Sequence, residues 1–148
     1  LLGHFGIEWD LTRATPQERA DLAAWVAVHK EVRDLVGSGR YVRGEHPDPS
    51  VLVTGVVAED ASEAVYVVAA LDSSLTRSPL PIALPGLDPA RRYRLEPLGP
   101  RGTGQLRAPD WSWVREGHLD LPGSVLGAGV RVPRMQPESA WVLRVRAL

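Results

Sequence analysis

The sequence has 148 residues, of which 44% are hydrophobic, and it carries a formal net charge of −1 and no cysteine. A chain of this length can bury one substantial core. The balanced charge gives no electrostatic case for a nucleic-acid partner or an anionic membrane surface. Disulfides and thiolate metal sites are excluded, and no apolar run approaches the roughly 20 residues that span a bilayer.

The first predicted element is a short buried strand at residues 4–9, HFGIEW, which are apolar and rich in strand-forming side chains. On a strand, Glu8 and Asp10 share one face. Two carboxylates on one face suit the acid and nucleophile of sugar hydrolysis, or a hard cation. The simpler interpretation, which we favour, is that Asp10 caps the following loop and Glu8 pairs with an arginine on a neighbouring strand.

A helix is predicted to follow over residues 16–36. Thr15 is a good N-cap, Pro16 occupies the first helical position, and Glu18 completes a capping box. Glycines at 37 and 39 end the helix. Apolar side chains recur at helical spacing and predict one buried face. We expect this face to pack against the domain that follows, with Trp25 largely buried there. This face comprises Leu22, Trp25, Val26, His29, Val32 and Val36.

Beyond this helix, short apolar runs alternate with turn clusters. Residues 51–58 and 64–71 are predicted to pair as a hairpin, and 81–86 and 93–98 flank the turn GLDPAR. Residues 99–123, rich in glycine and proline, are expected to form a long irregular connection. Several short strands with frequent turns predict a mainly β fold, an antiparallel β-sandwich.

The last strand is expected near the C-terminus, where Trp141, Leu143 and Val145 share one face and therefore point into the core. Upstream, in LGAGVRVP, we interpret GAG as a turn that leads into a strand.

Few side chains suggest chemistry. His29 lies on the apolar stripe of the helix, where a satisfied interfacial histidine is the favoured interpretation over a general base. The other histidines lack metal-ligand spacing, so no metal or cofactor is expected. Trp111 and Trp113, within WSW, are candidates for an aromatic platform that contacts sugar rings. The alternative, which we favour for at least one of them, is packing over the end of the sandwich.

A family resemblance joins these segments. Residues 3–40 resemble the last strand and helix of the catalytic barrel of glycoside hydrolase family 36, the microbial α-galactosidases. GLDPARRYRL is similar to the segment joining two strands of that family's C-terminal β-domain, and residues 123–145 are similar to its last two strands. The positions that carry the barrel resemblance are Gly3, Gly6, Glu8, Asp10, Leu11, Pro16, Glu18, His29, Lys30 and Gly39.

The resemblance implies a division into two parts. Residues 1–39 would be the terminal βα unit of a (β/α)8 barrel, and residues 40–148 the C-terminal antiparallel sandwich. The family's nucleophile and acid/base are aspartates on earlier barrel strands, so no catalytic residue is assigned here. Without neighbouring barrel strands, we expect residues 1–11 either to lose regular strand structure or, preferably, to pair with the same segment of another chain.

Three roles stay open at this point. The chain can be the C-terminal structural part of a retaining α-galactosidase, a carbohydrate-binding module, or a domain for homo-oligomer assembly. The expected partners are the rest of the parent enzyme, α-galactosides through that enzyme, and further copies of the chain; nucleic acid and membrane are not expected. A cytoplasmic location is expected.

Overall fold

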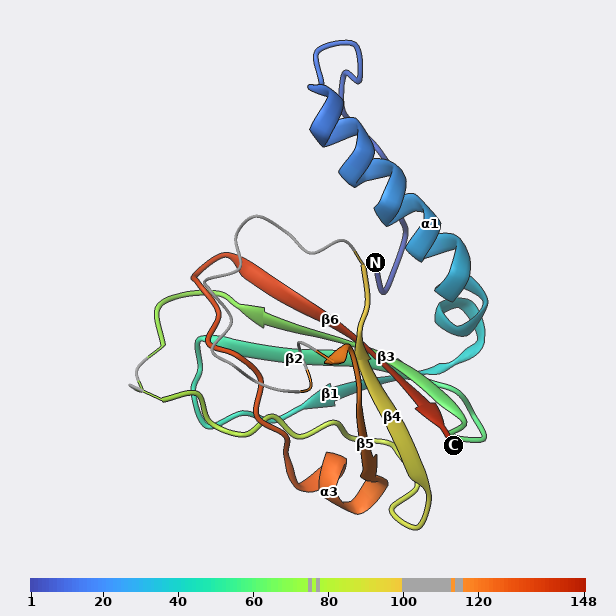
Figure 1. The fold of residues 1–148 in the computed structure, drawn as a ribbon, viewed down its shortest axis with the longest axis vertical. Coiled ribbons are helices and arrows are strands. Elements are labelled where there is room, and N and C mark those ends of the chain that lie inside the picture. The colour runs from blue at the N-terminus through green and yellow to red at the C-terminus, as the bar shows by residue number, and fades with distance from the viewer. Residues whose placement is uncertain (75, 77, 100–112, 114–115) are drawn as a thin grey trace.

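Antiparallel strands form the centre of the molecule. A computed structural model of the chain describes residues 1–74, 76, 78–99, 113 and 116–148. In these residues one six-stranded sheet has the order β1-β2-β3-β6-β4-β5 (Figure 1). Its strands are β1 (Arg40–Gly44), β2 (Val51–Val57), β3 (Glu63–Ala70), β4 (Arg92–Pro97), β5 (Leu119–Pro122) and β6 (Ser139–Ala147). The predicted mainly β, antiparallel fold is confirmed.

Strands β2, β3 and β6 follow the sequence pattern closely. β2 and β3 form the predicted hairpin, in register from Val51 opposite Ala70 to Val57 opposite Ala64. β6 lies between β3 and β4, where Leu143 and Val145 are fully buried and the exposed Arg146 points to the other face. Short apolar runs on either side of a turn cluster therefore predicted β2 and β3, and alternation with period two predicted the inward face of β6.

One face of the sheet carries the main core. Side chains from the strands meet Ile82, Leu84, Leu126 and Val130, which come from the segments that cover this face. Leu126 belongs to the short helix α3 (Gly123–Ala128). These segments do not pair with each other as strands, since Ile82 and Val130 form only an isolated β-bridge. The expected strand at 81–86 is therefore absent, and the segment after GAG forms this bridge instead of a strand.

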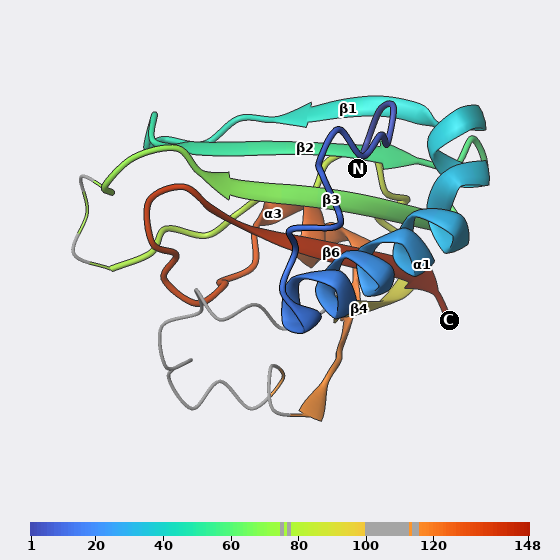
Figure 2. The ribbon, with the colours of Figure 1, turned by 90° about the horizontal axis from the view of Figure 1, so that it is seen from above.

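The opposite face is covered by helix α1 (Pro16–Ser38) and the N-terminal segment. Figure 1 shows α1 and α3 on opposite sides of the sheet, and Figure 2 shows α1 and the N-terminal segment on the same side. The predicted helix is confirmed and extends to Ser38. Its first turns project beyond the strands (Figure 1), and the part from Trp25 to Val36 packs on the sheet. The two parts proposed from the sequence are thus in direct contact.

The prediction of a buried strand at residues 4–9 is wrong for this structure. Residues 1–15 contain no strand, and Ile7, Trp9 and Leu11 are 43%, 48% and 41% exposed. A strand is stable only when neighbouring strands satisfy its backbone groups, and the described part of the chain offers none at this position. Of the two expected outcomes, a single chain shows loss of regular structure; pairing between copies stays a prediction.

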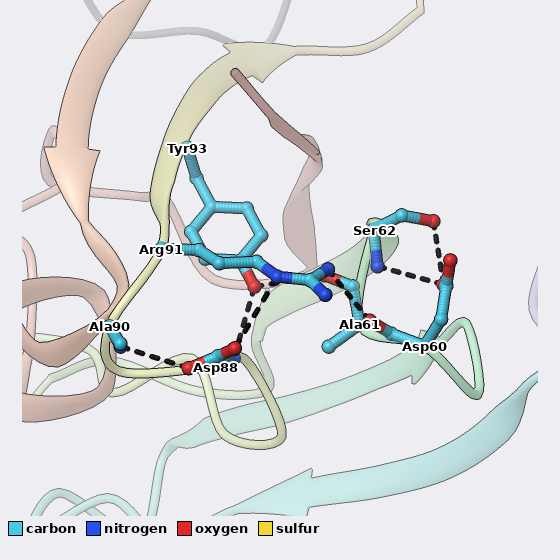
Figure 3. A network of polar contacts seen from close by, with 7 residues as sticks. All are labelled: Asp60, Ala61, Ser62, Asp88, Ala90, Arg91 and Tyr93. Atoms are coloured by element: carbon cyan, nitrogen blue, oxygen red, sulfur yellow. Dashed lines mark hydrogen bonds and ion pairs between the residues drawn. The ribbon is translucent and has the colours of Figure 1, made fainter.

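A polar network fastens the β2–β3 turn to the segment before β4 (Figure 3). Arg91 donates from Nη1 to the Asp60 carbonyl at 2.8 Å, and its Nε lies 3.3 Å from Oδ2 of Asp88. The buried Tyr93 donates its hydroxyl to the carbonyl of Ala61 at 2.9 Å and accepts the N–H of Asp88 at 3.0 Å. Because these groups satisfy one another, the network is structural.

Candidate functional site

The paired carboxylates do not form a closed site. Oδ1 of Asp10 accepts from the Thr12 hydroxyl at 2.6 Å and from the Thr12 N–H at 3.0 Å. These hydrogen bonds lower the pKa of Asp10. The carboxylate therefore caps its own turn, as the simpler interpretation predicted. Glu8 is exposed and forms no ion pair within the described part of the chain, so the expected partner arginine is absent there.

The structure describes only one of the two tryptophans that are candidates for sugar contact. Trp111 lies outside the described residues. Trp113 is 5% exposed and belongs to the main core, and its Nε1 has no hydrogen-bond partner among the described residues. Trp141 lies in the same core, as its strand pattern predicted. In this structure Trp113 contributes buried apolar area, and sugar contact by the pair stays a prediction.

His29 lies between α1 and the N-terminal segment. Its ring stacks on Phe5 with centroids 4.8 Å apart and planes 14° apart. The interfacial position agrees with the favoured interpretation. Its Nδ1, however, is buried and has no hydrogen-bond partner in the described residues. The sequence predicted a histidine with all its hydrogen bonds satisfied, and the described residues do not meet that prediction. The contact is one of packing, because no second catalytic group accompanies this ring.

The beginning and end of α1 are fixed locally. Oγ1 of Thr15 accepts the Glu18 N–H at 3.2 Å, and Oε2 of Glu18 accepts the Thr15 N–H at 2.8 Å. This is the predicted capping box, and its hydrogen bonds lower the pKa of Glu18. At the other end, a Cβ on Gly39 would lie 2.9 Å from the Val57 carbonyl oxygen. Only glycine lets the helix pass so closely into β1.

The sequence predicted that the helix packs on the sandwich, but not which residues meet there. We define the junction as the contact of α1 and residues 1–2 with the outer face of β3 and β6. Val32, Val65 and Val142 form its buried centre. Partly buried apolar side chains surround this centre: Leu1, Leu2, Trp25, Leu35, Val36, Val67 and Leu98. Trp25 is thus partly rather than largely buried, and its ring lies against Gly99, beyond the end of β4.

A largely buried arginine, Arg144, forms ion pairs across the junction. Arg144 on β6 is 12% exposed at its side chain, and its Nε donates to Oε1 of Glu63 on β3 at 2.6 Å. Its Nη1 pairs with Glu31 on α1. Burial lowers the pKa of Arg144, but the hydrogen bonds to the two carboxylates outweigh it, so the pKa is raised overall. Arg144 therefore connects the helix to two strands of the sheet.

The described residues offer no catalytic or metal centre of their own. Among them no group of three or more His, Asp or Glu side chains is placed to hold a metal ion. No helix in the described part of the chain is both long and apolar enough to cross a membrane. The junction is consequently the surface with the clearest functional meaning.

Comparisons with known proteins identify this arrangement. The family profile "Glycosyl hydrolase family 36 C-terminal domain" matches residues 51–141, which include β2, β3, β4, β5 and most of the inner core. The chain belongs to glycosyl hydrolase family 36. Its sheet is therefore the family's C-terminal domain, and the resemblance stated from the sequence is confirmed.

Relatives extend the match to the junction. An α-galactosidase of Escherichia coli is 32% identical over 149 residues, covering 95% of this chain and 21% of that protein. The α-galactosidase AgaA of Geobacillus stearothermophilus is 32% identical over 111 residues, covering 72% of this chain and 15% of that protein. A crystal structure of AgaA has a TM-score of 0.77 at 26% identity, covering 99% of this chain and 18% of that one. The chain spans about a fifth of the length of these relatives.

Proposed function

We propose that the chain is the non-catalytic, C-terminal structural part of a retaining α-galactosidase. In this proposal residues 1–39 close the catalytic barrel and residues 40–148 form the domain that supports it. The observation that carries the proposal is the junction, in which Arg144 and an apolar cluster bind α1 to the family's C-terminal sheet. The rest of the parent enzyme is the partner, and α-galactosides are its substrates.

The chemistry of the described residues supports a role without catalysis. A retaining glycosidase needs two carboxyl groups about 5–5.5 Å apart in an enclosed site. Asp10, by contrast, is exposed and hydrogen-bonded to Thr12, and Glu8 is exposed beside it. Ile7, Trp9 and Leu11 leave an apolar surface uncovered, and this surface suits burial against neighbouring barrel strands.

The proposal is tested by domain exchange in the Escherichia coli relative. One protein ends at the position that matches Gly39, so it keeps a complete barrel and lacks only the C-terminal domain. A second carries this chain in place of its own matching segment. We expect the shortened protein to lose soluble expression and α-galactosidase activity, and the exchange to restore them. Full activity and unchanged thermal stability in the shortened protein would contradict a supporting role.

Homo-oligomer assembly and a cytoplasmic location stay predictions of this proposal. Sugar binding through Trp111 and Trp113 is the alternative function, and the burial of Trp113 does not favour it.

A further inference from the structure

A second feature of the domain lies far from the junction, at the end of the sheet where β2 begins and β3 ends. A cavity of about 40 Å³ opens between the β1–β2 connection, the segment after β3 and the segment before β6. Space of this size holds about three groups as large as a water molecule. Its described lining combines apolar side chains such as Leu80 and Ile82 with a cluster of polar ones. This mixture is typical of small-molecule sites.

The polar side of the cavity is built around Asp48, which is only 3% exposed. Its Oδ1 accepts from the Ser50 hydroxyl at 2.7 Å and from the Ser50 N–H at 3.0 Å. Its Oδ2 accepts from the hydroxyl of Ser74 at 2.6 Å. Hydroxyl groups from two separate segments are thus held in place at the cavity wall. The fixed carboxylate keeps them oriented without any ligand.

His46 contributes a donor that has no partner among the described residues. Nδ1 of His46 lies 3.1 Å from the Asp48 N–H and 3.2 Å from the Asp48 carbonyl. The carbonyl already accepts the Val51 N–H at 3.1 Å, whereas the Asp48 N–H has only Nδ1 as its acceptor among the described residues. Nδ1 is therefore assigned as the acceptor, and the proton of the neutral ring lies on Nε2. This Nε2 is buried and has no partner in the described residues. A buried donor without an acceptor is destabilising, so an oxygen that reaches it is favoured.

The charges and hydrogen bonds around the cavity restrict the ligand. A phosphate or carboxylate is disfavoured, because Asp48 and Asp72 face it against one cation of the described lining, Arg134. A metal ion is disfavoured because the Asp48 oxygens already accept hydrogen bonds and Nε2 carries a proton. A neutral compound with hydroxyl groups fits both sides of the cavity. One of its oxygens accepts from Nε2, and its C–H groups pack on the apolar wall.

We propose that this cavity, the His46–Asp48–Ser74 pocket, binds the edge of a neutral polyhydroxy compound such as a single sugar ring. One ligand hydroxyl accepts from His46 Nε2, and this contact requires the ring to turn so that the buried nitrogen meets the cavity. Neighbouring ligand hydroxyls donate to the hydroxyl oxygens of the wall, because Ser50 and Ser74 already donate their own protons to Asp48. The described lining contains neither Trp113 nor a residue of the junction, so the supporting role proposed above can fail while this proposal stands.

The test is an NMR titration of the 148-residue chain with D-galactose and, separately, with glycerol. We expect saturable shifts of the Ser50 and Ser74 amides with a dissociation constant in the millimolar range. His46→Asn keeps an acceptor for the Asp48 N–H but removes the Nε2 donor, and it should weaken binding about tenfold. His46→Gln places an amide donor near Nε2 and should retain most of the affinity.

The matched control is His4→Asn, an exposed histidine outside the pocket, which should change nothing. Shifts that are absent with both polyols, or that are equal in the wild type and His46→Asn, would overturn the proposal. Titration with inorganic phosphate or Ca²⁺ separates the other ligand classes. If either moves the pocket amides while the polyols do not, the assignment to a neutral ligand is wrong.

Discussion

The indole ring of Trp25 on α1 lies directly against Gly99, just after β4. A Cβ on Gly99 would lie 2.6 Å from Cη2 of this ring, and the φ of Gly99 is +99°. Close approach and a left-handed backbone thus both require glycine here. The contact holds the helix to a second point of the sheet, beside the one that Arg144 provides.

Replacing this glycine should weaken the junction. We expect Gly99→Ala to lower the free energy of unfolding by about 1–3 kcal/mol, because the backbone is strained and the ring must move. Gly37→Ala is the matched control: a Cβ there meets nothing within 4 Å, and position 37 lies in α1. It should be neutral or stabilising by about 0.5–1 kcal/mol. Denaturant unfolding measures both, and equal effects would contradict the packing described.

Substitution of Arg144 should lower the free energy of unfolding more than substitution of its exposed partner Glu31. Arg144→Met removes the cation from both and should cost about 1–3 kcal/mol, since Glu63 then loses a partly buried partner. Glu31→Gln changes the more exposed partner and should cost only about 0.2–1 kcal/mol. Thermal or chemical unfolding gives the order. A larger loss for Glu31→Gln than for Arg144→Met would show that Arg144 is not the centre of this contact.

A protein that starts at Thr12 tests the N-terminal segment. It lacks Leu1 and Leu2, which pack at the junction, and Phe5, which stacks on His29. We expect a loss of roughly 1–3 kcal/mol in stability from the apolar area no longer buried. Light scattering should also show less self-association, because Ile7 and Trp9 are removed. If stability and association state are both unchanged, the segment has neither role.

Stability should fall in acid. Hydrogen bonds from Thr15 lower the pKa of Glu18, and hydrogen bonds from Arg94 lower that of Asp120. A carboxylate with a lowered folded-state pKa stabilises the fold above its unfolded pKa, about 3.9 for Asp and about 4.3 for Glu. That contribution disappears as the pH falls through the folded-state pKa. The melting temperature should therefore be nearly constant near neutral pH and drop below about pH 4. A melting temperature that rises on acidification would contradict these assignments.

Local signals in the sequence predicted the elements that depend on neighbouring residues. The start of α1 follows from Thr15 and Glu18, which bond to each other, and the inward face of β6 follows from strict alternation. Strand β1 was not predicted, since Val42 is its only buried residue and alternation is hard to recognise over five positions. β5 fell within the connection that was expected to be irregular.

The features that the sequence did not predict depend on contacts between residues that are far apart along the chain. Residues 4–9 have a strand composition but no neighbouring strand, and residues 81–86 are apolar but contain prolines that cannot donate to a ladder. Arg144 and Glu31 are 113 positions apart, so their contact has no sequence signal. The polar pocket was missed for the same reason, because His46 and Ser74 come from separate connections. The resemblance to family 36 supplied the architecture that these patterns alone did not.

The central claim, that the chain supports an α-galactosidase without performing its chemistry, is tested most directly by hydrolysis of an aryl α-galactoside. The purified 148-residue chain is incubated with nitrophenyl α-galactoside, and nitrophenol release is compared with buffer and with Asp10→Asn. We predict no release above buffer, since the exposed Asp10 and Glu8 form no enclosed pair of carboxyl groups. Release well above buffer that Asp10→Asn abolishes would contradict the account.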